Sequence, residues 1–148
     1  MRSSLIVSAL VFVGLATAPA ADAKRPDLRL AGGTVAQTPG GLTGSVVVRN
    51  AGGKRAPKTS LGLTAGSTLI ARITAPALAP HTKVKVTVSL SAPTNVGPGS
   101  YKLRMCADDR TAVRERSESN NCLRVGRLFV AQGSTPTPTG SVPTDPVS

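Results

Sequence analysis

The amino-acid sequence predicts an all-β fold, a sandwich of short antiparallel strands. Glycine occurs 15 times and proline 12 times in the 148 residues, so breaks in regular structure recur at short intervals. Between these breaks lie short runs rich in Val, Thr, Leu and Ile, and no long stretch places apolar residues at helical spacing. Seven such runs fit into about 108 residues, a number and a length typical of one sandwich domain.

Two terminal segments are expected to lie outside this domain. Residues 1–23 contain Arg2, the apolar run 5–16 and then small residues, which is the pattern of a secretory signal peptide. Residues 132–148 are rich in Pro, Thr, Ser and Gly, and we expect them to be disordered because they carry too little apolar surface to offset the entropy of ordering. The domain should therefore span residues 24–131 of a protein that is secreted, either extracellular or loosely associated with the cell envelope.

The strands are expected where β-rich runs are bounded by turn residues. These runs are residues 27–30, 42–49, 60–64, 69–73, 83–90, 100–107 and 122–130. Alternation is clearest in residues 83–90, where Val84, Val86 and Val88 share one face and should reach the core.

The last two strands are expected to carry cysteines and cations on the same outer side. In residues 100–107 the inward positions are those of Tyr101, Leu103 and Met105, so Lys102, Arg104 and Cys106 point outward. The same alternation turns Cys122 and Arg124 outward in residues 122–130. We predict a Cys106–Cys122 disulfide on this face, because an exported chain meets an oxidising environment. The cations Lys102, Arg104 and Arg124 should form a basic binding patch beside it.

A change of phase in the last strand predicts a β-bulge. Leu123 and Val125 alternate with outward residues, whereas Leu128 and Val130 have the opposite parity. One extra residue near Gly126 would return all four apolar side chains to the same face.

The basic character of the chain favours anionic partners. The formal net charge is +11, and removal of residues 1–23 takes away Arg2 and Asp22 together, which leaves this value unchanged. Single-stranded nucleic acid is bound through aromatic stacking, but Tyr101 and Phe129 are the only aromatic residues after residue 23, so we expect no nucleic acid. The expected partner is an anionic cell-envelope polymer or another cell-surface protein, and peripheral contact with phospholipid headgroups is a further use of the charge.

Several short motifs resemble one bacterial family in their order and spacing. They are Pro26-Asp27-Leu28, Val48-Arg49-Asn50-Ala51-Gly52, Leu78-Ala79-Pro80, Gly99-Ser100-Tyr101 and the run from Val113 to Asn121. This arrangement resembles the CARDB domains, the cell-adhesion-related domains of bacteria, with His81 where the family usually has glycine. The resemblance implies a seven-stranded immunoglobulin-like, fibronectin III-like antiparallel sandwich, commonly used as an extracellular stalk, spacer or binding unit. It brings no catalytic residues with it.

The acidic segment before the last strand has two interpretations. Asp108, Asp109, Glu115 and Glu118, with the amide oxygens of Asn120 and Asn121, have the chemistry of a calcium site. However, three arginines are interspersed and the EF-hand pattern is missing. We therefore expect a structural loop and no cofactor. In it, carboxylates accept backbone N–H groups or pair with arginines, and Asn120 and Asn121 adopt left-handed backbone angles.

Catalytic groups are scarce, because His81 is the single histidine and follows Ala79-Pro80 in a predicted turn. We expect a non-catalytic secreted module that binds or spaces components at the bacterial cell surface. The alternative is a secreted inhibitor or accessory subunit of an exported enzyme, whose loop 51–58 would enter the cleft of its partner.

Overall fold

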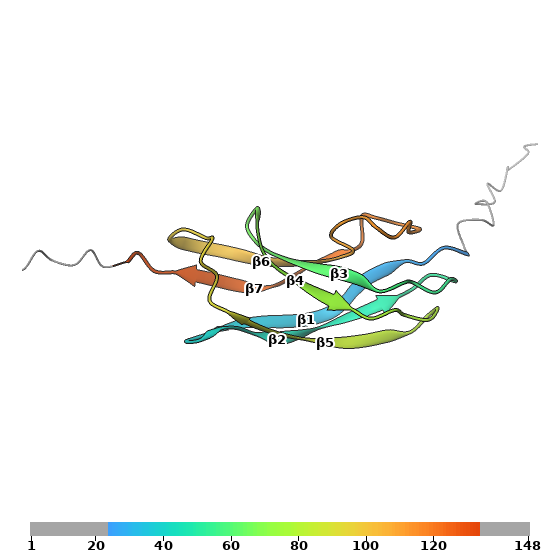
Figure 1. Cartoon of the computed structure of the whole chain (residues 1–148), viewed down its shortest axis with the longest axis horizontal. Helices are drawn as coiled ribbons and strands as arrows, with labels where there is room; N and C mark the ends of the chain where they lie inside the picture. The colour runs from blue at the N-terminus through green and yellow to red at the C-terminus, as the bar shows by residue number, and fades with distance from the viewer. Residues whose placement is uncertain (1–23, 134–148) are drawn as a thin grey trace, which may run out of the picture.

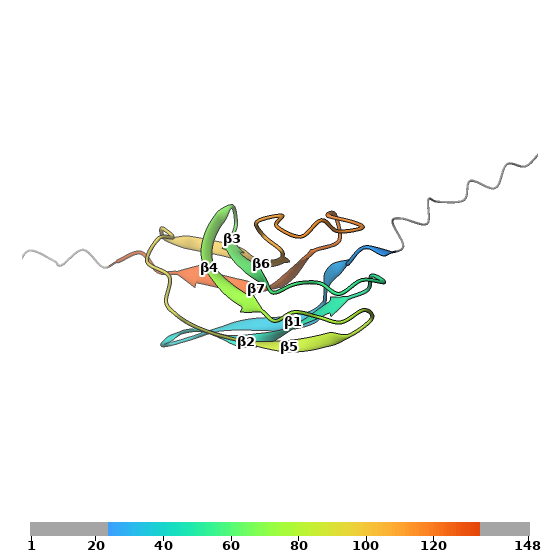
Figure 2. The same ribbon diagram turned by 45° about the vertical axis from the view of Figure 1, so that its right-hand side comes forward.

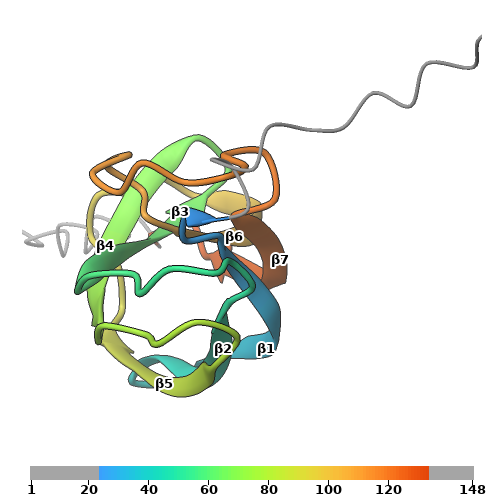
Figure 3. The same ribbon diagram turned by 90° about the vertical axis from the view of Figure 1, so that its right-hand side faces the viewer.

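The computed structural model describes residues 24–133, and it contains seven strands. In chain order they are β1(Leu28–Thr38), β2(Gly41–Asn50), β3(Thr59–Ala65), β4(Thr68–Ala75), β5(Lys83–Ser91), β6(Gly99–Ala107) and β7(Cys122–Val130). Hydrogen-bonded neighbours follow the order β4-β3-β6-β7-β1-β2-β5. The strands fold into two layers, with β1, β2 and β5 in one and the remaining strands in the other (Figures 1 and 3). The predicted all-β sandwich is confirmed. The expected signal peptide at 1–23 and most of the tail expected at 132–148 lie outside the described residues.

The first strand is longer than expected. The sequence predicted residues 27–30, whereas β1 continues to Thr38. The glycine pair in its middle resembled a turn, but the strand continues through a register shift between Leu30 and Gly32 in its pairing with β2. A Cβ atom at Gly33 would lie 2.5 Å from the carbonyl oxygen of Ser45, so glycine there lets the two strands approach closely.

The two layers are joined where β1 and β7 run parallel, with Val35 opposite Gly126. A Cβ at Gly126 would lie 2.1 Å from the carbonyl oxygen of Val35, so this contact requires glycine. The side chain of Gln37 extends the pairing, since its Nε2 donates to the Phe129 carbonyl and its Oε1 accepts from the Phe129 N–H, each at 2.8 Å.

The predicted bulge in the last strand is confirmed. Leu103 pairs with Gly126 and Arg104 pairs with Arg124, so Val125 is the extra residue of β7. Val125 at the bulge and Leu128 beyond it are buried, and Leu123 before it packs against the core. The bulge therefore keeps both halves of β7 in contact with the core.

Aliphatic side chains from both layers fill the core, as the scarcity of aromatic residues requires. Val86, Val88, Leu103 and Met105 are buried as predicted. Val84 and Tyr101 are half-buried and pack against the core. The hydroxyl of Tyr101 donates to the carbonyl of Gly97 at 3.0 Å, which ties the start of β6 to the preceding loop in the manner of a tyrosine corner. Within residues 24–133, no helix has the length and apolar character to cross a membrane.

Candidate functional site

The outer face of β6 and β7 brings four cations into two cross-strand pairs. Arg104 lies opposite Arg124 and Lys102 lies opposite Arg127, and all four side chains are exposed. Residues that are directly opposite in an antiparallel ladder share a face of the sheet. The structure thus brings together the predicted Lys102, Arg104 and Arg124. It adds Arg127, which sequence reasoning missed although the predicted bulge already reverses the parity of this residue. We call these four residues the β6–β7 basic face.

The Cys106–Cys122 disulfide closes one end of this face. The two residues are register partners, and they are bonded as predicted, at a sequence separation of 16. Both cysteines are half-buried. The bond joins the end of β6 to the start of β7, and the acidic loop 108–121 connects these two strand ends.

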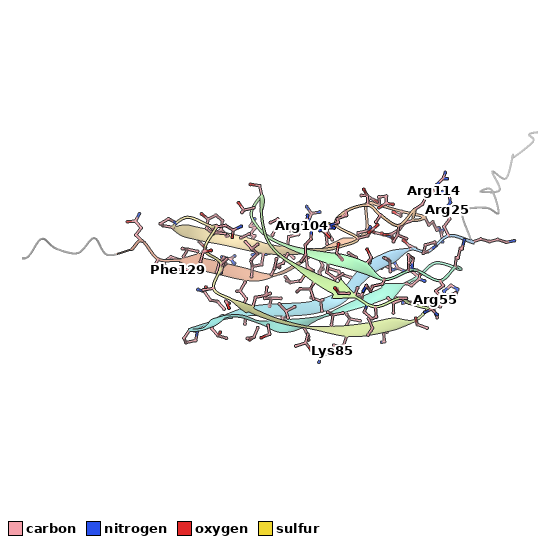
Figure 4. All side chains as sticks on the ribbon, viewed as in Figure 1. Arg25, Arg55, Lys85, Arg104, Arg114 and Phe129 are labelled. Atoms are coloured by element: carbon pink, nitrogen blue, oxygen red, sulfur yellow. A yellow bond between two sulfur atoms is a disulfide. The ribbon has the colours of Figure 1, made fainter. Side chains whose placement is uncertain are left out.

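Phe129 marks the other end of the same face. It is opposite Ser100 in register and its side chain is 62 % exposed, so a large apolar group lies two positions from Arg127. Because the amide of Gln37 holds its backbone on both sides, this exposed ring projects from a fixed position. Figure 4 labels it near the end of β7.

A second group of cations, also missed from the sequence, lies on the opposite layer. Arg29 is in register with Arg49, and Arg49 is in register with Lys83, so three exposed cations form a row across β1, β2 and β5. Lys85 is exposed two positions further along β5. Figure 4 shows Arg104 and Lys85 on opposite outer sides of the sandwich. Their grouping could not be predicted from the sequence, because it depends on which strands pair.

The acidic loop between β6 and β7 separates Asp109 from the other carboxylates. Asp109 accepts hydrogen bonds from the Ser60 hydroxyl and from Arg72 Nε, the latter an ion pair at 2.6 Å. Burial acts to raise the pKa of Asp109, but the hydrogen bonds from Ser60 and Arg72 and the nearby guanidinium charges outweigh it and hold this pKa below its usual value. Asp109 therefore ties the loop to β3 and β4, and it lies outside the group formed by the other three carboxylates.

Asp108 organises the start of the loop as a structural carboxylate should. Its Oδ1 accepts from the Thr59 hydroxyl at 2.7 Å and from the Ala112 N–H at 3.1 Å, and its Oδ2 accepts from the Val113 N–H at 2.8 Å. Asp108 and Thr111 adopt left-handed backbone angles. The expectation that Asn120 and Asn121 would adopt left-handed backbone angles was wrong, because the residues with positive φ lie at the start of the loop.

The loop between β6 and β7 lies beside the start of β1 (Figure 2), and Glu115 ties its middle to that strand. Its Oε2 accepts from the Leu28 N–H at 2.5 Å and its Oε1 accepts from Asn121 Nδ2 at 3.1 Å. Burial, together with the negative charges of Glu118, Asp108 and Asp27, raises the pKa of Glu115 to about 7, against the opposing effect of the Leu28 hydrogen bond. Oxygen atoms of Asp108, Glu115 and Glu118 lie within 4.8 Å of one another.

Comparison with known proteins identifies the family. A family model described as CARDB matches residues 25–125, which is more than half of the 148-residue chain. The chain belongs to the CARDB family. CARDB is a non-enzymatic domain family associated with adhesion-related proteins of the cell surface, and the resemblance seen in the sequence motifs is confirmed. No curated protein matches the chain.

Two solved structures share the fold of this CARDB domain. A domain of a protein from Methanosarcina acetivorans, named as a cell surface protein, is 23 % identical with a TM-score of 0.55 and covers 75 % of this chain and 95 % of its own. The CARDB domain of the PF1109 protein from Pyrococcus furiosus, solved in complex with di-metal ions, is 23 % identical with a TM-score of 0.52 and covers 73 % of this chain and 89 % of its own. At these identities the likeness establishes the immunoglobulin-like sandwich fold.

The loop 51–58 of this CARDB domain is firmly held at its base. Asn50 is fully buried, its Nδ2 donates to the Lys54 carbonyl at 2.7 Å, and its Oδ1 accepts from the Gly52 N–H at 3.0 Å. Ala56 forms a β-bridge with Leu78. His81 is an exposed turn residue with φ of 59°, in the turn where the sequence placed it.

Proposed function

We propose that this CARDB domain is a secreted, non-catalytic module of the bacterial cell surface that binds an anionic polymer of the envelope through the β6–β7 basic face. The family supports a role at the cell surface. The basic face supports the chemistry of the partner, because a formal net charge of +11 favours anions in general and these four exposed cations are concentrated on two neighbouring strands.

The observation that carries this proposal is the pairing of like charges. Arg104 opposite Arg124, and Lys102 opposite Arg127, are cross-strand pairs of the kind that destabilise a sheet. Exposed threonine or serine at these positions would suit an outer face better. Arg29 with Arg49 and Arg49 with Lys83 are like-charge pairs as well, but they form a single row, whereas the β6–β7 basic face has two successive pairs along its strands and ends at the exposed Phe129. A negatively charged partner on the β6–β7 basic face would convert the repulsion of both pairs into attraction.

The dimensions of the face suit an extended polymer. Lys102 and Arg104 are two residues apart on β6, which corresponds to about 7 Å along an antiparallel strand. The four cations therefore form two rows about 7 Å apart, so one polymer chain with regularly spaced anionic groups can contact both rows. Each exposed cation contributes less than about 1 kcal/mol, and the summed field determines retention.

The test compares two variants that remove the same charge from opposite faces. The first is Lys102→Ser, Arg104→Ser and Arg124→Ser on the β6–β7 basic face. The second is Arg29→Ser, Arg49→Ser and Lys83→Ser on the other layer, and serves as the matched control. Retention of the mature protein on isolated cell envelopes is measured at about 0.05 M and 0.5 M salt, where the Debye length is about 14 Å and 4 Å.

We expect the first variant to lose most of its retention at low salt, the control to lose much less, and the difference to shrink at high salt. The melting temperature of the first variant should stay equal to that of the parent or rise slightly, because a repulsive pair has been removed. Equal losses in the two variants would show that net charge alone is responsible. If the first variant is retained as well as the parent at both salt concentrations, the loops and not the β6–β7 basic face recognise the polymer.

A further inference from the structure

Phe129 is an aromatic side chain that folding leaves in solvent. Its exposed fraction is 62 %, and among residues 24–133 it is the one large apolar side chain that is exposed. Tyr101, the other aromatic residue of the domain, packs against the core. A single exposed apolar residue is ordinary on a protein surface. What distinguishes Phe129 is its position, because it continues the β6–β7 basic face.

The ladder between β6 and β7 places the ring in line with the cations. Phe129 is two positions from Arg127 on β7, so both side chains emerge on the same side of the sheet. Ser100 lies opposite Phe129 in register, as Lys102 lies opposite Arg127. Because Ser100 is small and exposed, no long side chain from that position covers the ring. The outer face therefore has an aromatic row followed by two cationic rows.

The backbone that carries the ring is fixed in the free domain. Gln37 of β1 donates from Nε2 to the Phe129 carbonyl and accepts at Oε1 from the Phe129 N–H, each at 2.8 Å. Both backbone groups of Phe129 are thereby occupied from the side of β1. A ligand that covers the ring immobilises only a few side-chain torsions, so little conformational entropy is lost on binding.

An aromatic ring in line with cations suits a sugar that bears an acidic group. One face of a pyranose ring presents C–H groups, which pack well on the electron-rich face of an aromatic ring. Guanidinium and ammonium groups form charge-assisted hydrogen bonds with carboxylates and phosphates. The exposed hydroxyl of Ser100 lies beside the ring and can bond to a sugar hydroxyl. A polyphosphate chain offers the anions but has no apolar face for Phe129.

We infer that the anionic polymer bound by the β6–β7 basic face is an acidic polysaccharide, with one of its sugar rings stacked on Phe129. This inference rests on the proposed function, since it names the class of polymer that the same face binds. Successive rows are about 7 Å apart along an antiparallel strand, so a few consecutive sugars of an extended chain can contact all three rows. The cationic row on the opposite layer has no exposed large apolar residue within the described chain, so this combination belongs to the β6–β7 layer.

An anionic membrane also combines charge with apolar contact, but the shape of this face does not suit one. Apolar side chains that bind membranes have to pass below the headgroups. Phe129 stands on a strand, and the longer side chains of Arg127 and Lys102 stand in the adjoining row of the same face. These cations would meet the headgroups before the ring could reach the acyl chains.

The test compares two soluble polyanions by isothermal calorimetry with the mature protein. Polygalacturonate carries a carboxylate on each sugar, whereas polyphosphate has no sugar ring. Phe129→Ala should bind polygalacturonate about tenfold more weakly than the parent, because the burial of the ring is lost, and should bind polyphosphate within about twofold of the parent. Phe129→Leu, which keeps apolar bulk without an aromatic face, should recover only part of this loss.

Salt separates the contribution of the ring from that of the cations. The ratio between the parent and Phe129→Ala should be similar at about 0.05 M and 0.5 M salt, because apolar contact is not screened. The Lys102→Ser, Arg104→Ser and Arg124→Ser variant should weaken binding of both polymers, and mainly at low salt. The melting temperature of Phe129→Ala should match that of the parent, because the bonds to Gln37 involve only the backbone of residue 129.

The outcomes distinguish this inference from the function on which it rests. The inference is overturned, and the proposed function stands, if the parent binds only polyphosphate or if Phe129→Ala binds polygalacturonate like the parent. Equal losses for both polymers in Phe129→Ala would also overturn it. Unaltered binding of both polymers by the triple serine variant would overturn the proposed function itself. If Phe129→Ala weakens sedimentation with phosphatidylglycerol vesicles and leaves polygalacturonate binding unchanged, the ring contacts a membrane instead.

Discussion

Removal of the Cys106–Cys122 disulfide should destabilise the domain by about 3 kcal/mol. The bond spans a sequence separation of 16, so it closes a loop with 15 residues inside it. In the chain-entropy model such a closure removes about 10 cal/mol/K from the unfolded chain, which is about 3 kcal/mol at 25 °C. For a domain of this size the same change corresponds to a fall of roughly 12 °C in the melting temperature.

The folded structure should survive this change because the loop has other anchors. Asp108 accepts from the Val113 N–H, Glu115 accepts from the Leu28 N–H, and the Arg116 N–H donates to the Pro26 carbonyl at 2.9 Å. The loss is therefore expected to arise from greater freedom of the unfolded chain. Cys106 and Cys122 are both half-buried, so replacing them with Ala removes few packing contacts.

The assay is urea unfolding of the Cys106→Ala, Cys122→Ala double variant, followed by far-ultraviolet circular dichroism. The parent is measured with and without a phosphine reductant, and both comparisons should give the same loss. A difference below about 1 kcal/mol would refute the entropic account. So would a loss in the double variant that reduction of the parent fails to reproduce, because that would place the effect in folded-state packing.

Two further predictions concern the β1–β7 contact and the buried glutamate. Gly126→Ala should cost at least about 2 kcal/mol, since its Cβ would lie 2.1 Å from the Val35 carbonyl oxygen, whereas Gly40→Ala, whose Cβ meets nothing within 4 Å, should change unfolding free energy by less than about 0.5 kcal/mol. The contribution of Glu115 to stability should be fully present below about pH 4.5 and should fall by up to about 3 kcal/mol as the pH rises to 7, because the pKa of Glu115 rises from 4.5 to about 7 on folding and the unfolded chain ionises first. Denaturant melts from pH 4 to 8 measure this, and a fall of equal size in Glu115→Gln would contradict the assignment.

Much of the fold could be predicted because two signals are local in the sequence: the alternation of apolar and polar residues within a strand, and the Gly and Pro residues between strands. Val86 and Val88 were assigned to the core from residues 83–90 alone, and the bulge near Gly126 followed from a change of parity within one strand. The extension of β1 could not be predicted, since a Gly-Gly pair such as Gly32-Gly33 is a common turn signal. Only the close approach of β2 shows that they belong to a strand.

The site was less accessible to sequence reasoning because it depends on partners distant in the chain. Lys102, Arg104 and Arg124 could be grouped once a disulfide was expected to join their strands. The row of Arg29, Arg49 and Lys83 required the strand order. The division of the acidic loop was equally hidden, because Asp108 and Asp109 are adjacent in sequence but bind different elements, Asp109 through Arg72 of β4.

The parallel contact of β1 with β7 has a mechanical consequence. The start of β1 and the end of β7 lie at opposite ends of the domain (Figure 1), so tension applied at Leu28 and Val130 pulls the two strands along their length in opposite directions. Under such shear, the contacts that join them, including both Gln37–Phe129 hydrogen bonds, bear the load together instead of opening one after another. Forced unfolding is limited by the rate of crossing a single barrier. The barrier is high because the contacts between β1 and β7 must break at the same time. A domain stretched between two anchors would therefore keep its length until β1 and β7 separate in one step.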